Sequence, residues 1–168
     1  MMHHHCCMYY DTIGTLPTPF LETSQQQLPT IYAITPTYAR ATQRVDLISL
    51  CHTLMHVPKI TWIVVEDSVD RTQTVKNLLA RQCKSVTSIH LTAKTSSNVK
   101  GGGKGINQRN AGLSWIRQNC RSSNNNNNNN NNTTVSVEKK CRGVVYLMDD
   151  DNKYDLRLFQ EVGHRNSY

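Results

Sequence analysis

Short apolar runs alternate with longer stretches of mixed polarity along most of the chain. The apolar runs predict strands near residues 30–35, 61–66, 86–91 and 143–148. The stretches between and after them predict helices within residues 40–57, 71–82, 107–120 and 154–162. The predicted strands are nearly continuous in their apolar residues, which is typical of a parallel sheet covered on both faces. The pattern therefore predicts a three-layered α/β domain with a mostly parallel sheet flanked by helices.

Two local features delimit the first predicted strand and helix. Pro36 follows the first apolar run and is expected to end that strand. Much of the apolar spacing in the next stretch suits one helix face, formed by Val45, Leu47, Ile48, Leu50, Leu54 and Met55.

Polar residues stand at the predicted C-terminal ends of three strands. They are "TPTY" (Thr35 to Tyr38), "ED" (Glu66 and Asp67) and "DDD" (Asp149 to Asp151). Parallel strands bring such ends to one edge of a sheet, where ligands bind near the point at which the strand order reverses. We therefore expect the three groups to share that edge.

The domain organisation follows from where these patterns begin and end. We expect a mobile leader at residues 1–28, a ligand-binding α/β domain at 29–162, a low-complexity Asn-rich insertion at 121–141, and a separate tail at 163–168. The insertion includes nine consecutive Asn and cannot build a core. Asn131 and Asn132 each begin an N-x-[ST] pattern, which matters only in a secreted chain.

Length and charge limit the classes of function. The 168 residues suffice for one domain, and the formal net charge of +7 suits an anionic partner. Between Thr92 and Arg142 stand nine basic residues and a single acid, Glu138. A nucleic-acid or heparin-like polyanion binder is therefore one alternative, although no base-reading motif accompanies the charge and no nucleic acid is expected.

The Gly-rich segment "GGGKG" (Gly101 to Gly105) differs from a phosphate-binding P-loop. Gly105 stands where that motif needs Ser or Thr after the lysine. The segment is either a flexible linker or a mobile loop that brings Lys100, Lys104 and Arg109 to an anion.

The cysteines and the apolar segments indicate neither a zinc site nor a membrane span. The six Cys form no CxxC pair, so a zinc site is not indicated, and disulfide pairing stays open. The chain has no apolar run near the 18 residues of a membrane span and no signal-peptide pattern.

The triplet Asp149, Asp150 and Asp151 is the sharpest chemical signal. Carboxylates and phosphate oxygens are the ligands that Mg²⁺ and Mn²⁺ prefer, and a neighbouring carboxylate can accept hydrogen bonds from sugar hydroxyls. The alternative is a solvated turn, with Asp155 as the N-cap of the last helix. With Asp67, a basic loop and the ring of Tyr38 nearby, the triplet favours a nucleoside diphosphate as ligand.

Three ordered segments resemble the β-1,3-glucuronyltransferases of proteoglycan and glycoprotein synthesis. They are "PTIYAITPTYARATQRVDLISLCHTLMHVPKITWIVVEDS", "GINQRNAGLSWIR" and "GVVYLMDDDNKYDLRLFQE", and the resemblance runs from about Leu28 to Glu161. It implies a GT-A type nucleotide-sugar-binding fold, UDP-glucuronate as donor and Mn²⁺ as cofactor. It also implies inverting transfer to a galactose-terminated glycan, Golgi membrane localisation, and a homodimer, as is common in the family.

The resemblance also implies a role for each matching residue. Pro36, Thr37, Tyr38 and Asp67 match the uridine-binding positions, and Arg109 matches a donor-contacting arginine. Asp149, Asp150 and Asp151 match the DxD-type motif, whose last Asp holds the metal. Lys104 stands where the family has an arginine, which keeps the charge and loses the bidentate fork.

After Glu161 the chain departs from the family, in which an acceptor-binding half with the general base follows. The sequence thus predicts the donor half of the enzyme, truncated before the acceptor-binding half. Two hypotheses remain open: a manganese-dependent glucuronosyltransferase, and a catalytically incomplete UDP-sugar-binding fragment in which the missing base makes transfer slow.

Overall fold

The computed structural model describes residues 29–95, 105–120 and 143–164. The leader at 1–28, the Asn-rich insertion at 121–141, Lys104 and the last four residues of the tail at 163–168 lie outside the described residues.

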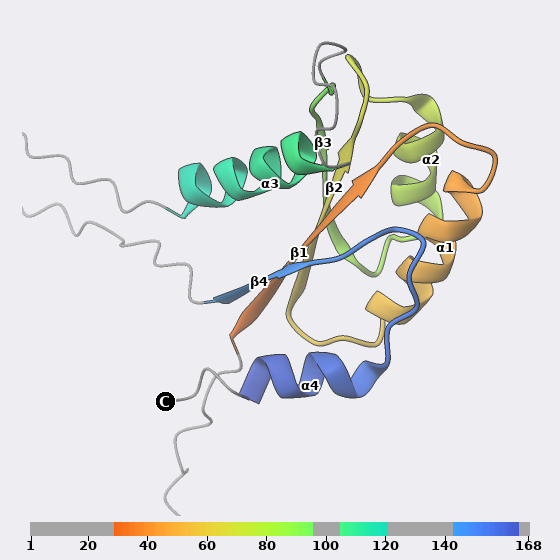
Figure 1. The fold of residues 1–168 in the computed structure, drawn as a ribbon. Helices are drawn as coiled ribbons and strands as arrows, with labels where there is room; N and C mark the ends of the chain where they lie inside the picture. The colour runs from red at the N-terminus through yellow and green to blue at the C-terminus, as the bar shows by residue number, and fades with distance from the viewer. Residues whose placement is uncertain (1–28, 96–104, 121–142, 165–168) are drawn as a thin grey trace, which may run out of the picture.

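Four strands and four helices alternate along the described chain, as the sequence predicts (Figure 1). The elements are β1 (Thr30–Thr37), α1 (Gln43–Leu54), β2 (Ile60–Glu66), α2 (Gln73–Arg81), β3 (Thr87–Thr92), α3 (Ile106–Asn119), β4 (Gly143–Leu147) and α4 (Leu156–His164). The predicted strand boundaries agree within two residues, and the helices fall within or near their predicted ranges.

The four strands form one sheet in the order β3-β2-β1-β4, and every pair is parallel. Ile34 on β1 pairs with Ile63 on β2 and with Leu147 on β4, so β1 is central. The chain moves outward from β1 to β3 and then crosses to β4 on the opposite side of β1. The strand order therefore reverses beside β1, and the C-terminal strand ends around it form the edge where ligands bind in such folds.

The expected end of β1 at Pro36 is wrong, because the strand continues to Thr37. The carbonyl of Ile34 accepts a hydrogen bond from Met148 N–H, so this part of β1 faces β4 at Ile34. Pro36, two residues on, faces the same side, but β4 ends at Leu147. A proline is tolerated there because no neighbouring strand needs a hydrogen bond from a backbone N–H at that position.

Helices cover the two faces of the sheet unequally (Figure 1). α1, α2 and α4 lie on one face and α3 lies on the other. The larger core lies under α1, α2 and α4 and includes the fully buried Trp62, whose indole N–H donates to Thr35 Oγ1 at 2.9 Å. On the other face, a Cβ at Gly112 of α3 would lie 2.7 Å from Ile34 Cγ2. A glycine at that position therefore lets α3 pack close to β1.

The buried face of α1 is narrower than the apolar spacing suggests. Its buried apolar residues are Leu47, Leu50, Cys51 and Leu54, which follow the helical repeat. Val45 is 66% exposed and Met55 is 38% exposed, so neither contributes to the core.

A disulfide between Cys51 and Cys83 joins α1 to the segment after α2. Both cysteines are buried in the larger core, and 32 residues separate them in sequence. The pairing that the sequence left open is thus settled for these two cysteines.

The last helix begins as the sequence predicts. Asp155 Oδ1 accepts the backbone N–H of Arg157 at 2.9 Å, directly before α4. Its hydrogen bonds with Arg157 lower the pKa of Asp155 to about 2. Asp155 is therefore confirmed as the helix N-cap. Among the described residues, no helix is both long and apolar enough to cross a membrane.

Candidate functional site

A pocket of about 530 Å³ opens at the C-terminal ends of the strands. Its lining residues are Pro36, Thr37, Tyr38, Asp67, Thr95, Gly105, Gln108, Arg109, Asp149, Asp150 and Asp151. They come from the ends of β1, β2, β3 and β4 and from the start of α3. Eight of the nine site residues expected from the sequence meet here, and the ninth, Lys104, lies outside the described residues.

The two sides of the pocket contain different groups. The base side is defined here as Tyr38, Asp67, Thr95 and Gln108, at the ends of β1, β2 and β3 and on α3. The metal side is defined as Arg109 with Asp149, Asp150 and Asp151, at the end of β4 and on α3.

On the base side, a chain of hydrogen bonds fixes the Asp67 carboxylate. Thr95 donates its backbone N–H to Asp67 Oδ1 and its hydroxyl to Asp67 Oδ2, each at 2.7 Å. Because the Thr95 hydroxyl is used as a donor, it accepts from Gln108 Nε2, at 3.1 Å. The same Nε2 donates to the carbonyl of Ala93. These contacts fix the orientation of the Asp67 carboxylate, and all of them are made by neutral groups.

Gln108 has a buried acceptor at this site. The residue is 1% exposed, and its Oε1 has no hydrogen-bond partner among the described residues. Both of its contacts require the Nε2 N–H groups, which fixes the orientation of the amide. A buried amide oxygen without a partner costs free energy unless a ligand or water satisfies it.

The neighbouring Glu66 takes no part in the pocket. It is completely buried, accepts two hydrogen bonds from Thr72, and lies 3.0 Å from His90 Nε2. Burial lowers the pKa of His90, and the hydrogen bond with Glu66 opposes that shift. Of the "ED" pair, only Asp67 reaches the shared edge, because successive side chains of a strand point to opposite faces. Thr35 of "TPTY" is likewise buried and accepts from Trp62.

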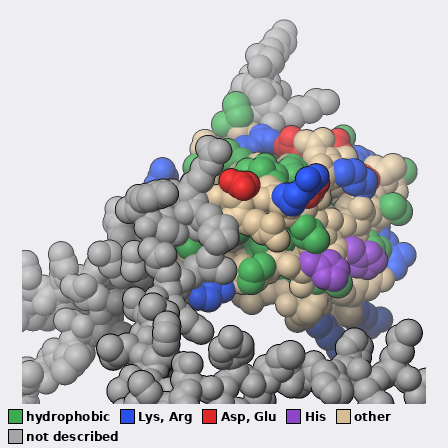
Figure 2. Space-filling view, turned by 90° about the horizontal axis from the view of Figure 1, so that it is seen from below, with side chains coloured by type: hydrophobic (Ala, Val, Ile, Leu, Met, Phe, Trp, Pro, Cys, Tyr) green, Lys and Arg blue, Asp and Glu red, His purple; other side chains and the backbone are tan. Residues whose placement is uncertain are grey.

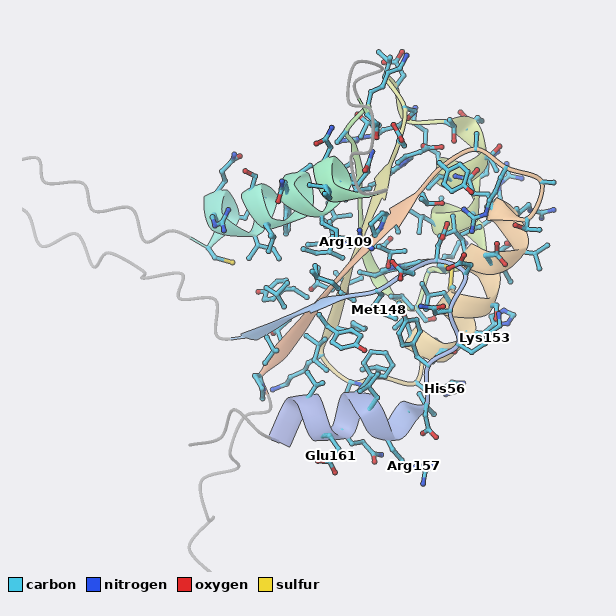
Figure 3. The ribbon with its side chains drawn as sticks, in the orientation of Figure 1. His56, Arg109, Met148, Lys153, Arg157 and Glu161 are labelled. Carbon is cyan, nitrogen blue, oxygen red and sulfur yellow. A yellow bond between two sulfur atoms is a disulfide. The ribbon has the colours of Figure 1, made fainter. Side chains whose placement is uncertain are left out.

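On the metal side, the three consecutive aspartates have different surroundings. Asp149 Oδ1 accepts from Arg109 Nη2 at 2.5 Å, and Arg109 extends from α3 towards the sheet (Figure 3). Asp150 is 7% exposed, and its Oδ2 accepts from Thr37 Oγ1 at 2.6 Å and from Arg40 Nη1 at 2.7 Å. Asp151 is exposed to the pocket and makes no side-chain hydrogen bond with the described residues.

These surroundings leave Asp151 as the carboxylate with room for a cation. Asp149 and Asp150 each form an ion pair with a guanidinium, and Asp150 shares Arg40 with Asp46. No group of three His, Cys, Asp or Glu in residues 29–95, 105–120 and 143–164 could hold a metal ion by itself. A divalent cation fits this pocket in the manner of sites that use one carboxylate together with ligand phosphates.

α3 begins at the pocket with a glycine that its backbone requires. Gly105 is the N-cap of α3 and has φ of 83°. A Cβ there would lie 2.7 Å from Arg109 Nη1 and 3.1 Å from Pro36 Cβ. The N-terminus of α3 thus reaches the pocket wall, where its free N–H groups favour an anion.

Four residues of the site were not expected from the sequence. Thr95, Gly105 and Gln108 line the pocket, and Arg40 supports it through Asp150. Gly105 belongs to the Gly-rich segment "GGGKG", and Gln108 belongs to the segment "GINQRNAGLSWIR". Thr95 and Arg40 carry no local pattern that distinguishes them from surface residues.

A comparison with models of protein families assigns the chain to a family. The model of glycosyltransferase family 43 matches residues 50–166. The chain belongs to glycosyltransferase family 43. The match reaches past residue 162, at which the sequence prediction ended the domain. The parallel sheet with helices on both faces agrees with a GT-A type domain of this family.

Three glucuronosyltransferases are similar to this chain and agree with this family. The chain is 38% identical over 136 residues to galactosylgalactosylxylosylprotein 3-beta-glucuronosyltransferase 2 of Homo sapiens, covering 81% of this chain and 38% of the relative. It is 35% identical over 161 residues to the corresponding enzyme 1 of Pan troglodytes, covering 92% of this chain and 43% of that relative. Enzyme I of Drosophila melanogaster is 38% identical over 143 residues, covering 80% of this chain and 41% of that relative.

The chain therefore spans about two fifths of the length of the curated relatives it matches. The family-model match at residues 50–166 includes the pocket residues from Asp67 to Asp151 and begins after Pro36, Thr37 and Tyr38. The family resemblance expected from the sequence is confirmed.

Proposed function

We propose that the pocket binds UDP-glucuronate with Mn²⁺ and serves the inverting transfer of glucuronate to a terminal galactose of a glycan. The observation that carries this proposal is the convergence of eight expected donor-binding positions on one cavity at the strand-order reversal. The names of the relatives support the choice of glucuronate as the transferred sugar.

The base side suits a uracil. The ring of Tyr38 is 49% exposed and offers a face for stacking. An ionised carboxylate only accepts hydrogen bonds, so Asp67 selects a base edge that presents an N–H. Uracil donates from N3, whereas cytosine has an acceptor at N3 and can donate to the carboxylate only from its exocyclic 4-amino group, in a shifted position. The contacts of Thr95 hold that acceptor in place before the ligand arrives.

The metal side suits the diphosphate. Asp151 would hold Mn²⁺ together with phosphate oxygens, as hard cations prefer. The bound ion supplies electrostatic stabilisation of the negative charge that develops on the departing diphosphate. The N-terminus of α3 faces the same space and favours anionic oxygens. Arg109, paired with Asp149, lies where a donor-contacting arginine is expected.

The disulfide supports a secretory compartment. Structural disulfides form and persist in oxidising compartments and are rare in the cytosol. Cys51 and Cys83 are joined within the buried core. This agrees with the Golgi lumen as the site of action, which is part of the proposal. The homodimer expected from the family is proposed on that resemblance.

A binding assay followed by a transfer assay tests the proposal. Calorimetry should detect UDP binding that strengthens when Mn²⁺ replaces a chelator, and CDP should bind more weakly. Transfer from UDP-glucuronate to a digalactoside is then measured with and without Mn²⁺. Equal affinity for UDP and CDP, or affinity that is independent of metal, would contradict the proposed donor site.

A second candidate function is donor binding without efficient transfer. Asp67, Asp149 and Asp150 are all engaged within the pocket, and Asp151 is assigned to the metal. The described residues thus leave no pocket carboxylate to act as general base towards an acceptor hydroxyl. General-base help is typically worth about 10²–10⁴-fold in rate. UDP binding with turnover slower than the relatives by that factor would favour this alternative.

The polyanion-binding alternative has less support. Of the nine basic residues between Thr92 and Arg142, only Lys94, Arg109 and Arg117 are described, and Arg109 pairs with Asp149. On the face shown in Figure 2, Lys and Arg side chains are scattered rather than gathered in one patch. An electrophoretic shift of heparin at physiological salt that UDP does not reverse would favour this alternative.

A further inference from the structure

Arg40 lies between the base side and the metal side without lining the pocket. It follows β1 and precedes α1, and its side chain is 16% exposed. Its guanidinium carbon lies 4.8 Å from the centroid of the Tyr38 ring. The same guanidinium donates from Nη1 to Asp150 Oδ2 at 2.7 Å. One side chain therefore contacts the stacking ring of the base side and the central aspartate of the metal side.

The remaining donors of Arg40 hold the guanidinium still. Nε donates to Thr42 Oγ1 at 3.1 Å, and Nη2 donates to Asp46 Oδ2 at 2.9 Å. All three nitrogens are thus engaged, with partners on both sides of the planar fork. The hydrogen bond with Asp150, foremost among these contacts, raises the pKa of Arg40 above its already high ordinary value.

The partner aspartate is fixed at one oxygen only. Asp150 Oδ2 accepts from both Arg40 and Thr37, and Thr37 Oγ1 in turn lies 3.2 Å from Gln43 Nε2. No described residue donates a hydrogen bond to Asp150 Oδ1. The buried side-chain atoms without a partner do not include this oxygen, so it is accessible to a ligand. Asp150 therefore presents one oriented acceptor oxygen at the pocket wall.

We propose that Arg40 is a positioning residue that sets the Tyr38 ring and the Asp150 carboxylate in one fixed relation, so that the nucleoside and the metal-bound diphosphate are recognised together. The inference rests on the proposed donor site and assigns a role to a residue outside the pocket wall. A lysine cannot replace Arg40, because a single ammonium lacks the planar fork that reaches Asp150, Asp46 and Thr42 while lying over a ring.

The test compares two ligands on matched variants. Uridine without metal reports the base side, and UDP with Mn²⁺ against UDP with chelator reports the metal side. Arg40→Gln and Arg40→Lys are measured beside Arg157→Gln, a matched loss of an exposed guanidinium outside the pocket. Ligand-observed NMR measures uridine, calorimetry measures UDP, and a melting curve confirms that each variant is folded.

We expect Arg40→Gln to weaken uridine binding and the Mn²⁺-dependent gain in UDP affinity, each by about tenfold, as expected for the loss of a charge-assisted hydrogen bond. Arg40→Lys should weaken both by about threefold or more, and Arg157→Gln should leave both within about twofold of wild type. A double variant with Tyr38→Leu should show less than additive loss for uridine, because both changes remove the same platform.

Several outcomes would overturn the inference. Folded Arg40 variants with wild-type affinity for both ligands would assign Arg40 a scaffold role only. Loss confined to one ligand would refute the coupling of the two sides, and so would failure of both Arg40 variants to fold. Wild-type protein that binds neither uridine nor UDP would overturn the donor site itself, which distinguishes that failure from the failure of Arg40.

Discussion

Carboxylates stand on both sides of the pocket, and the structure satisfies them in different ways. On the base side, Asp67 receives two hydrogen bonds from the neutral Thr95, which Gln108 supports. On the metal side, Asp149 and Asp150 are each paired with an arginine, while Asp151 has no such partner among the described residues.

Under the proposed function, the difference separates a half-site whose carboxylate is already oriented from a half-site that a cation would complete. Neutral donors fix the direction of Asp67 and leave its negative charge available to a base N–H. Guanidinium groups pair with two of the three adjacent aspartates, which offsets part of the repulsion between their carboxylates. In the proposed donor site the third charge would hold the metal, so ligand binding on the metal side should depend on the ion in a way that binding on the base side does not.

The largest expected effect follows from removing that third charge. Asp151→Asn should reduce the Mn²⁺-dependent affinity for UDP by more than about 100-fold, since even residues behind a metal ligand are worth about 10–100-fold. Binding of uridine without metal should stay unchanged. Calorimetric titration with Mn²⁺ and with chelator measures both.

Asp155→Asn is the matched control for this change. Asp155 caps α4 and lies outside the pocket, so its replacement should leave UDP affinity within about twofold of wild type. Equal UDP affinity of wild type and the Asp151 variant in Mn²⁺ would show that the triplet is no metal site.

The next effect concerns the scaffold beneath both sides. Replacing Cys51 and Cys83 by Ala removes a cross-link that spans 32 residues of sequence. The free energy of unfolding should fall by about 2–4 kcal/mol, as is typical for such a loop. Urea unfolding measures this loss, with the oxidised wild type as reference. The ratio of uridine to UDP affinity should not change, and a shift in that ratio would contradict a purely structural role.

A smaller effect should be confined to the base side. Thr95→Val removes the hydroxyl between Asp67 and Gln108 and should weaken uridine binding by about tenfold, as expected for one lost charge-assisted hydrogen bond. Thr95→Ser keeps the hydroxyl and should bind nearly as wild type does. Ligand-observed NMR measures uridine. A comparable loss in the Mn²⁺-dependent gain would show that the two sides are not separable at Thr95.

The smallest effect is a pH dependence of the free energy of unfolding that arises from His90, beside the buried Glu66. Burial lowers the pKa of His90 below its ordinary value of 6.5. The unfolded chain therefore takes up a proton near pH 6.5 that the folded protein accepts only at lower pH. Stability from this group is present above pH 6.5 and is lost as pH falls through the folded pKa. Chemical unfolding between pH 7.5 and pH 5 should show this decline, and His90→Gln should reduce it. An unchanged slope in the variant would contradict the assignment.

The order of the elements could be predicted because parallel strands buried on both faces are nearly continuous apolar runs. The convergence of Tyr38, Asp67 and Asp149–Asp151 followed from the same inference, since parallel strands end at one edge. The pattern of strands alone did not separate Glu66 from Asp67, and the choice of Asp67 came from the family resemblance; the structure shows that Glu66 is buried while Asp67 lines the pocket. The expected end at Pro36 was wrong because a strand can continue through a proline where the neighbouring strand, here β4, does not pair with the missing N–H. The sequence does not show which strand lies beside Pro36.

The sequence by itself determined the fold class, the family and eight of the pocket positions. Local periodicity and ordered motifs can be recognised from the order of residues without knowledge of their contacts. Only the tertiary structure decided how the carboxylates differ. The pairing of Arg40 with Asp150 joins residues 110 positions apart, and the contact of Gln108 with Thr95 joins residues 13 apart. Adjacent aspartates look equivalent in a sequence, and they differ in the fold because each turns towards a different cation or towards solvent. The free energy of an ionised group is set by the charges and donors around it in space, which the order of residues does not record.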